Sequence, residues 1–301
     1  MRGVSKVLLT GAQGQLGYEL QKTVEGDTQL IATDNDTLNI CDAEQLKSAL
    51  AKHQPDWVIN AAAYTAVDKA ESDQEAAYAV NAHAPALLAQ AIAEQNKQQA
   101  TAIRLIHIST DFVFNGQQST PYSTEATTDP LGVYGASKLA GEQAVLQHLP
   151  EAIIIRTAWL YSSHGNNFVK TMLRLMQEKN QLDIVYDQVG SPTWARTLAL
   201  VIWDLMGKNV QGVLHCSDNG VASWYDFAIA IQEEALQLGL LKRKITLKPI
   251  GSKAYPTPAQ RPAFSVMDKS RTESAIGYSL PYWRTTLRAM LEELHYKTQE
   301  A

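Results

Sequence analysis

Short apolar runs alternate with longer stretches of helical spacing through the first half of the chain. The apolar runs are rich in Val, Ile and Leu and predict strands at residues 6–10, 29–33, 57–60, 105–109 and 153–156. Apolar residues three and four positions apart predict helices at about 15–23, 43–52, 74–95 and 133–147. Strands that are apolar throughout and separated by helices are typical of a parallel sheet covered on both faces. The pattern therefore predicts an α/β fold with a doubly wound parallel sheet.

The pattern of predicted elements changes after about residue 157. Helices are predicted near 167–178 and 223–238, between short strands and proline-containing loops. A last helix is predicted over 281–294, with Pro281 at its start and Trp283, Leu287, Met290 and Leu294 on one face. We expect residues 1–160 to form the first domain and residues 161–301 to form mainly a smaller α/β lobe, with some later segments returning to the first domain.

Composition narrows the class of protein. The chain has 301 residues, a net charge of -5 and 45% hydrophobic residues, and we see no basic run that would hold nucleic acid. No apolar stretch approaches the length of a membrane span, and the apolar start is too short for a signal sequence. Cys41 and Cys216 lack metal-ligand spacing, so we expect reduced thiols in a cytoplasmic protein.

A glycine-rich turn follows the first predicted strand. In Thr10-Gly-Ala-Gln-Gly-Gln-Leu-Gly17, the glycines Gly11, Gly14 and Gly17 come after a strand and open a helix. Glycine allows the tight turn and a close approach of the backbone to a pyrophosphate, which the amides of the helix N-terminus attract. The turn predicts dinucleotide binding on a Rossmann-type sheet. A turn without a ligand is the alternative.

Several residues further along are candidates for the rest of a dinucleotide site. Asp34 ends the second predicted strand, where a carboxylate can accept hydrogen bonds from the adenosine ribose. That position favours NAD(H) over NADP(H), but neighbouring loops leave the choice open. Asn39 and Ile40 are candidates to flank adenine. Ala61, Ala62 and Ala63 have small side chains, so the backbone of a dinucleotide could lie close to them. The alternative is that they allow a helix to pack closely on a strand.

Thr110, Tyr134 and Lys138 predict carbonyl chemistry. A hydride can reach a ketone carbon only if the oxygen receives a proton, and a tyrosine with a pKa of ~10 is a weak donor or base at neutral pH. Lys138 follows Tyr134 by one helical turn, so we expect its ammonium to favour the tyrosinate. Thr110, at the end of a strand, would hold the carbonyl oxygen. The motif is common on ordinary helices, and its place after the glycine turn is what favours catalysis.

With these motifs the chain resembles the extended short-chain dehydrogenases that act on nucleotide sugars. Within that family it resembles the dTDP-4-dehydrorhamnose reductases. The likeness covers nearly the whole chain. It is carried by the glycine turn and by the runs Asn60 to Glu71, Ser109 to Gly116, Val133 to Glu142, Arg156 to Tyr161 and Asp187 to Thr193.

The resemblance implies a reaction, a cofactor and roles for individual residues. The reaction is reduction of the C4 ketone of a dTDP-linked 6-deoxy-hexulose to dTDP-L-rhamnose by NADPH, with NADH as an alternative, and residues 161–301 would mainly bind the nucleotide sugar. Tyr134 would donate the proton to O4, and Lys138 would assist it and bind the ribose. Thr110 and Asp111 would hold the sugar, and Trp159 would line its pocket. The expected dinucleotide contacts are Gln15, Leu16, Asp34, Asn39, Ile40, Ala62, Ala63 and Tyr64.

The resemblance also raises the question of whether this protein binds a metal ion. Some members of the family bind magnesium between subunits through three glutamates, of which the first resembles Glu19 here. The second falls at Arg196, and an arginine cannot ligate a cation that requires oxygen donors. We therefore expect no metal at this place. A homodimer is an expectation that this departure leaves open.

Alternative functions share parts of this pattern. A 4,6-dehydratase or a 4-epimerase would use the same cofactor site. A dehydratase, however, has a glutamate after the aspartate, where this chain has Phe112 after Asp111. An epimerase usually has a Ser-Ser-Ala run at this place, which this chain lacks. A non-catalytic regulatory subunit, like the β subunit of methionine adenosyltransferase, would keep the fold without turnover. Arg261 is a candidate to bind the sugar diphosphate, with a surface salt bridge as the alternative.

Overall fold

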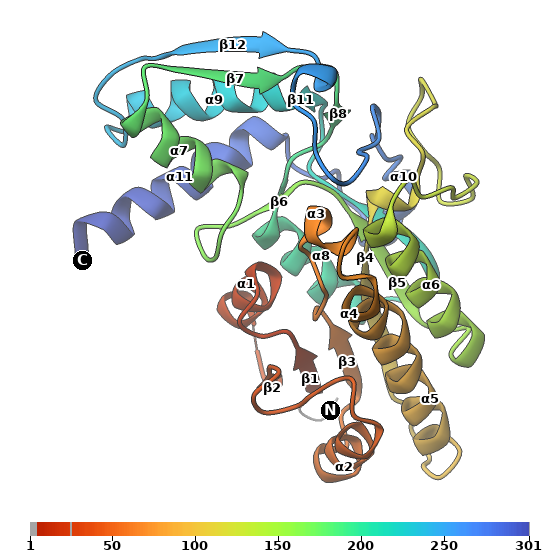
Figure 1. Cartoon of the computed structure of the whole chain (residues 1–301). Helices are drawn as coiled ribbons and strands as arrows, with labels where there is room; N and C mark the ends of the chain where they lie inside the picture. The colour runs from red at the N-terminus through yellow and green to blue at the C-terminus, as the bar shows by residue number, and fades with distance from the viewer. Residues whose placement is uncertain (1–4, 25, 301) are drawn as a thin grey trace.

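The computed structural model describes residues 5–24 and 26–300 and is built around a six-stranded parallel sheet (Figure 1). The strands lie in the order β10-β5-β4-β3-β1-β2, and every neighbouring pair is parallel. This sheet confirms the predicted α/β fold class. The strands are β1 (Lys6–Thr10), β2 (Gln29–Thr33), β3 (Trp57–Asn60), β4 (Arg104–Thr110), β5 (Ile153–Thr157) and β10 (Gly212–Cys216).

Helices cover both faces of the sheet because alternate strand residues point to opposite sides. Val7 and Leu9 of β1 pack with the buried faces of α1 (Gln15–Thr23) and α8 (Ala195–Met206). Leu8, between them, packs on the other side with residues of α2 (Ala43–His53), α5 (Ala84–Asn96) and α6 (Val133–His148). Both faces of β1 are thus buried, which explains its unbroken apolar sequence.

The helix predicted over 74–95 is divided into three parts. The chain forms α4 (Gln74–Tyr78), then a π-helical turn η1 (Ala79–His83), then α5. The wider turn holds the buried side chain of Asn81, which accepts from the Tyr64 amide at 2.9 Å and donates to the Ser137 hydroxyl at 3.1 Å. The turn therefore connects the loop after β3 to helix α6. A short helix, α3 (Val67–Ala70), precedes it.

The second lobe lies beyond the carboxyl ends of the strands and has its own core (Figure 1). Its parallel pair of strands is β7 (Gln181–Val185) and β12 (Thr246–Ile250). Helices α7 (Phe168–Glu178) and α9 (Trp224–Gln237) pack against this pair, and α11 (Trp283–Glu300) packs against α9. The remaining elements are short: β6 (Leu160–Tyr161), β8 (Val189–Gly190), β9 (Thr193–Trp194), β11 (Ala222–Ser223), α10 (Ser270–Ile276), η2 (Asp111–Val113) and η3 (Ser252–Ala254).

The predicted strands agree with the structure to within a residue at each end, and two elements of the sheet layer were missed. Helix α8 and strand β10 come from the second half of the chain, and β10 completes the sheet beside β5. The last helix begins at Trp283 rather than at Pro281 and continues to Glu300. Within the described residues, the structure contains no helix that is both long and apolar enough to span a membrane.

The close contact of α6 with η1 gives a test of the packing. A Cβ atom on Gly141 would overlap the carbonyl oxygen of Asn81. Gly141→Ala should therefore destabilise the protein by about 1–3 kcal/mol, the usual cost of overpacking a buried contact. The control is Gly207→Ala, where the new Cβ atom would lie 3.6 Å from its nearest neighbour and the backbone φ is -84°. Denaturant unfolding measures both, and equal stability of the two variants would contradict this packing.

Candidate active site

A cavity of about 850 Å³ opens at the carboxyl ends of β1, β3 and β4. The chain leaves β1 for β2 on one side and later returns to β3 on the other side, so this edge is the point where ligands bind in doubly wound sheets. Most of the residues predicted to form the site line this cavity: Gly11, Gly14, Gln15, Leu16, Asp34, Asn39, Ile40, Ala62, Ala63, Thr110, Asp111, Tyr134, Lys138 and Trp159.

The glycine turn forms one wall of this cavity. Gly11 has a φ of +73°, and a Cβ atom there would lie 2.6 Å from the amide nitrogen of Ala62. A Cβ atom on Gly17 would overlap the carbonyl oxygen of Gly11, so Gly17 allows α1 to pack against the turn without lining the cavity itself. Backbone and small side chains thus face the space in which a pyrophosphate can approach the N-terminus of α1.

Asp34 is held in a fixed orientation at the end of β2. Its Oδ2 accepts from the backbone amide of Gln13 at 2.8 Å, and its Oδ1 accepts from the amide of Asn35 at 2.8 Å. The carboxylate therefore joins the glycine turn to the loop after β2. Both loops line the cavity, as a site for the adenosine end of a dinucleotide requires.

Tyr64 differs from the other predicted cofactor contacts. Its hydroxyl donates to Asp73 at 3.2 Å, its amide bonds to Asn81, and it is not among the residues that line the cavity. In this structure Tyr64 connects the loop after β3 to α4 and η1. Its neighbours Ala63 and Thr65 do line the cavity.

The structure brings the predicted catalytic residues together at the other end of the cavity. Thr110 ends β4, Asp111 begins η2, and Tyr134 and Lys138 lie one turn apart on α6. A Cβ atom on Gly135 would overlap the carbonyl oxygen of Phe112, so α6 can approach η2 closely at this glycine. The Phe112 ring meets the Tyr134 ring edge-on, with 5.5 Å between centroids. Tyr134 and Thr110 therefore line the same end of the cavity.

Lys138 is buried, with 2% of its surface exposed, and its Nζ donates to the carbonyl oxygen of Ile108 at 2.6 Å. The next turn of α6 carries Glu142, whose carboxylate forms a buried ion pair with Arg156 of β5 at 2.7 Å and accepts from the Ser109 hydroxyl. Sequence reasoning missed this pair. It ties α6 to β4 and β5 directly behind the catalytic residues.

Burial sets the protonation of the site, and it corrects one prediction. Burial raises the pKa of the Tyr134 phenol to about 12, although the Thr110 hydroxyl favours the charged form. Burial also lowers the pKa of Lys138 to about 8, against the attraction of Glu142. The expectation that the Lys138 ammonium makes Tyr134 more acidic is not met in this structure, because loss of solvent outweighs the Thr110 hydroxyl and the nearby Asp111 carboxylate raises the pKa further.

Asp111 is a second perturbed group beside the cavity. Its Oδ1 accepts from the Thr110 hydroxyl at 3.1 Å, while its Oδ2 is buried without a protein partner. Burial raises its pKa to about 6, although the nearby Ser265 and Thr110 hydroxyls favour the charged form. A buried acceptor without a partner favours a donor from a bound molecule, such as a sugar hydroxyl.

Trp159 forms the wall between the cavity and the second lobe. Its φ is +46°, an unusual value for a large side chain, and its ring stacks on Trp224 with 3.6 Å between centroids. A Cβ atom on Gly190 would lie 2.7 Å from the Trp159 indole, so a glycine is required there. Trp224 supports Trp159 from behind.

Arg261 is not among the residues that line the cavity. Its Nη2 forms an ion pair with Asp68 at 2.8 Å, and both side chains are partly exposed. In this structure the guanidinium thus makes the salt bridge that was the alternative to diphosphate binding. The loop containing Gly165 and Asn166 does line the cavity, next to Gln15, and no pattern in the sequence had indicated it.

No group of three or more His, Cys, Asp or Glu side chains is placed to hold a metal ion anywhere in residues 5–24 and 26–300. The cavity offers backbone amides, hydroxyls, one lysine and carboxylates instead. These groups suit a dinucleotide and a polar substrate. Together with the parallel sheet and the glycine turn, the Thr110, Tyr134 and Lys138 set defines the class of the protein as a short-chain dehydrogenase/reductase of the extended type.

Comparison with known proteins identifies the family within this class. The chain belongs to the family described as the RmlD substrate binding domain, whose model matches residues 5–296. A similar relative is the dTDP-4-dehydrorhamnose reductase of Aggregatibacter actinomycetemcomitans, with 38% identity covering 95% of this chain and 98% of the relative. This membership confirms the resemblance seen in the sequence.

Two further comparisons bear on substrate and cofactor. A Streptomyces antibioticus protein, named as a probable dTDP-4,6-dihydroxy-2-methyloxan-3-one 4-ketoreductase, is 39% identical and covers 95% of each chain. The crystal structure of the dTDP-4-dehydrorhamnose reductase of Bacillus anthracis in complex with NADP has a TM-score of 0.89 and 34% identity, covering 96% of this chain and 99% of that one.

Asp34 gives a test of the cofactor end of the cavity. Asp34→Asn removes the negative charge but keeps the size of the side chain, so repulsion of a 2′-phosphate should decrease. We expect the ratio of NADPH affinity to NADH affinity to rise by about tenfold, or ~1.4 kcal/mol. Titration calorimetry measures the two Kd values. Asp36→Asn, on the same loop but outside the cavity lining, is the matched control, and an unchanged ratio in Asp34→Asn would remove Asp34 from cofactor selection.

Proposed function

We propose that this protein reduces the C4 ketone of dTDP-4-dehydro-6-deoxy-L-mannose (dTDP-4-dehydrorhamnose) to dTDP-L-rhamnose with NADPH, and that it accepts NADH as well. The observation that carries the proposal is the meeting of Thr110, Tyr134 and Lys138 at one end of a cavity whose other end is the glycine turn. The relatives named as reductases of this substrate, and the relative crystallised with NADP, support it.

The chain's own residues hold the substrate and transfer one proton to it. Tyr134 keeps its phenol proton at neutral pH, because burial raises its pKa to about 12, and it donates that proton to O4 of the sugar. The Thr110 hydroxyl donates a hydrogen bond to the same oxygen, and the Asp111 carboxylate accepts one from a hydroxyl of the sugar. When bound, NADPH supplies the hydride that adds to C4. The proton from Tyr134 neutralises the alkoxide at O4 and gives the alcohol, so positioning and proton donation are what the protein contributes.

Lys138 provides the positive charge of the site. We assign it to the nicotinamide ribose and to stabilisation of the alkoxide that develops as the hydride arrives. A charge that acts on the developing alkoxide assists the reaction without making the resting phenol acidic. This role is compatible with the raised pKa of Tyr134.

The two parts of the chain divide the ligands in this proposal. Residues 1–160, whose sheet layer α8 and β10 complete, bind the dinucleotide, and residues 161–301 bind mainly the dTDP sugar. Trp159 lines the sugar pocket from between them. We further propose a cytoplasmic location, which the two free thiols Cys41 and Cys216 support, with no nucleic acid or membrane as partner. A homodimer stays a prediction.

The Streptomyces relative favours a second candidate, the reduction of another dTDP-linked ketone. The deciding assay follows the absorbance of NADPH and NADH with freshly prepared dTDP-4-dehydrorhamnose and with other dTDP-4-keto sugars. We expect the highest kcat/KM with dTDP-4-dehydrorhamnose. Preference for another 4-keto sugar would select the second candidate, and tight cofactor binding without turnover of any of them would indicate a regulatory subunit.

The proton donor is tested by Tyr134→Phe, which removes one hydroxyl. We expect kcat to fall by about 10²–10⁴, the usual size of a general-acid contribution, while the Kd of NADPH changes by less than about twofold. Tyr296→Phe, an exposed tyrosine on α11, is the matched control and should behave as wild type. A Tyr134→Phe enzyme with normal turnover would exclude the phenol from the mechanism.

The pH dependence should report Lys138 rather than Tyr134. Lys138 has its pKa lowered to about 8, so it loses its proton as the pH rises through that value. Tyr134 stays protonated there. We expect kcat/KM, which reflects the free enzyme, to fall above about pH 8. Steady-state kinetics from acid to alkaline pH at constant ionic strength measure it, and a profile that stays flat well beyond pH 8 would contradict the role of the ammonium.

A further inference from the structure

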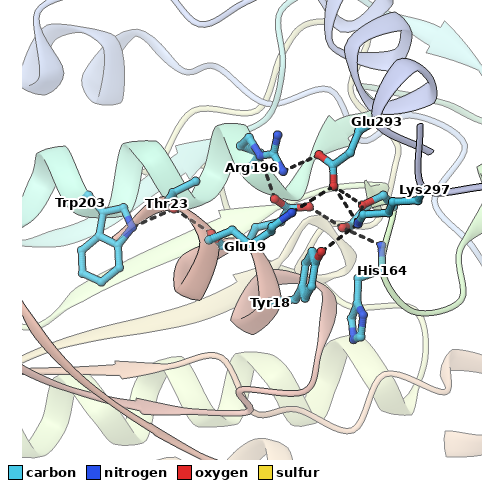
Figure 2. Close-up of polar contacts among 11 residues, drawn as sticks. Tyr18, Glu19, Thr23, His164, Arg196, Trp203, Glu293 and Lys297 are labelled. Atoms are coloured by element: carbon cyan, nitrogen blue, oxygen red, sulfur yellow. Dashed lines mark hydrogen bonds and ion pairs between the residues drawn. The ribbon is translucent and has the colours of Figure 1, made fainter. Parts of the chain in front are cut away.

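A cluster of charged side chains outside the cavity joins three helices that are far apart in the sequence (Figure 2). Glu19 of α1 is completely buried, and its Oε2 accepts from Arg196 Nε of α8 at 2.9 Å. The Nη2 of Arg196 forms an ion pair with Glu293 Oε2 of α11 at 2.5 Å. One guanidinium therefore bridges two carboxylates, one from each lobe.

A second cation completes the charge balance of this cluster. Lys297 Nζ pairs with Glu293 Oε1 at 2.8 Å and donates to the hydroxyls of Tyr18 and Ser163, each at 2.8 Å. Burial alone would raise the pKa of Glu293, but Lys297, Ser163 and Arg196 outweigh it and lower that pKa to about 2. The two carboxylates thus face Arg196 and Lys297 at close range, and Lys22 Nζ lies 3.8 Å from Glu293 Oε1.

The cluster connects to the cavity through residues 162–167. The Ser162 hydroxyl donates to Glu19 Oε1 at 2.6 Å. His164 stacks on Tyr18 and its Nε2 lies 2.9 Å from the carbonyl oxygen of Gln13. Asn167 donates to the side chain of Gln15 at 2.9 Å. Gln13 and Gln15 belong to the glycine turn and line the cavity, so the cluster and the cofactor wall share one loop.

A divalent cation does not fit this arrangement. The resemblance implied magnesium held by three glutamates, with Glu19 as the first and Arg196 in place of the second. The guanidinium stands between Glu19 and Glu293, where it supplies N–H donors and positive charge but no oxygen ligand. Its planar fork suits two carboxylates at once.

We propose that Arg196 occupies the place where the resemblance puts a metal ion between subunits, and that its two ion pairs instead join α11 to the dinucleotide-binding lobe within one chain. This junction, and with it the cofactor wall, then forms without any divalent cation. Arg196 is a positioning residue in this proposal, because it acts on the cavity through residues 162–167 and touches no ligand. The inference concerns stability and cofactor affinity. It therefore stands or falls independently of which sugar the enzyme reduces.

The test compares melting temperatures in EDTA and in about 10 mM MgCl₂, a concentration at which a carboxylate site for Mg²⁺ would be occupied. Wild-type protein should melt within about 1 °C of the same temperature in both. Arg196→Glu places three carboxylates together and should melt at least about 5 °C lower in EDTA. Mg²⁺ should restore much of that loss for Arg196→Glu, because oxygen ligands replace the guanidinium.

A second variant keeps the proposal testable if Arg196→Glu does not fold. Arg196→Gln leaves Glu19 and Glu293 without their bridging charge, so it should melt lower with or without Mg²⁺. Its Kd for NADPH should rise severalfold while kcat at saturation stays within about twofold. The matched controls lie in the exposed pair that Arg174 forms with Glu178 on α7: Arg174→Gln for Arg196→Gln, and Arg174→Glu for Arg196→Glu.

Three results would overturn the proposal. One is a wild-type melting temperature, or a molar mass by light scattering, that responds to Mg²⁺. Another is an Arg196→Gln variant with wild-type stability and NADPH affinity. The third is a folded Arg196→Glu variant that is destabilised in EDTA but does not respond to Mg²⁺, since the site would then not be equivalent to a cation site.

Discussion

The hydrogen bond from the buried ammonium of Lys138 to the carbonyl oxygen of Ile108 is the contact on which the candidate site depends. It fixes the rotation of α6 against the end of β4. Tyr134 lies one turn earlier on the same face, and Thr110 follows Ile108 by two residues, so this one contact brings both toward the same space. A buried cation is costly unless it is paired, and the Ile108 carbonyl and the nearby Glu142 carboxylate reduce that cost.

Local patterns predicted most of the sheet and failed where distant segments decide the structure. The centres of the strands at residues 6–10 and 57–60 are apolar because helices bury both of their faces, and that pattern is visible in the sequence. Strand β10 is less distinct, with His215 and Cys216 among its residues, and it becomes part of the sheet only by pairing with β5. The π-helical turn was also missed, because it depends on the tertiary contacts of Asn81.

The candidate site shows the same division. The glycine turn and the Thr110, Tyr134 and Lys138 set could be predicted because their spacing follows from the geometry of a strand, a turn and one helical face. Their protonation could not, because the pKa of Tyr134 depends on how much solvent the assembled site removes. Arg261 illustrates the limit for long side chains. Its sequence context allowed either a ligand or a salt bridge, and only the fold brings Asp68 within reach.

The junction between the lobes and the catalytic end solve a similar electrostatic problem in different ways. Each buries a carboxylate, Glu19 or Glu142, and each neutralises it with an arginine from another element. Such pairs gain little stability over apolar packing, but removing one partner leaves a buried charge and is costly. They therefore specify which helix meets which neighbouring helix or strand. A divalent ion can supply the same charge, yet its contribution depends on its concentration, whereas Arg196 is always present. Exchanging the ion for a side chain makes the junction a property of the chain alone.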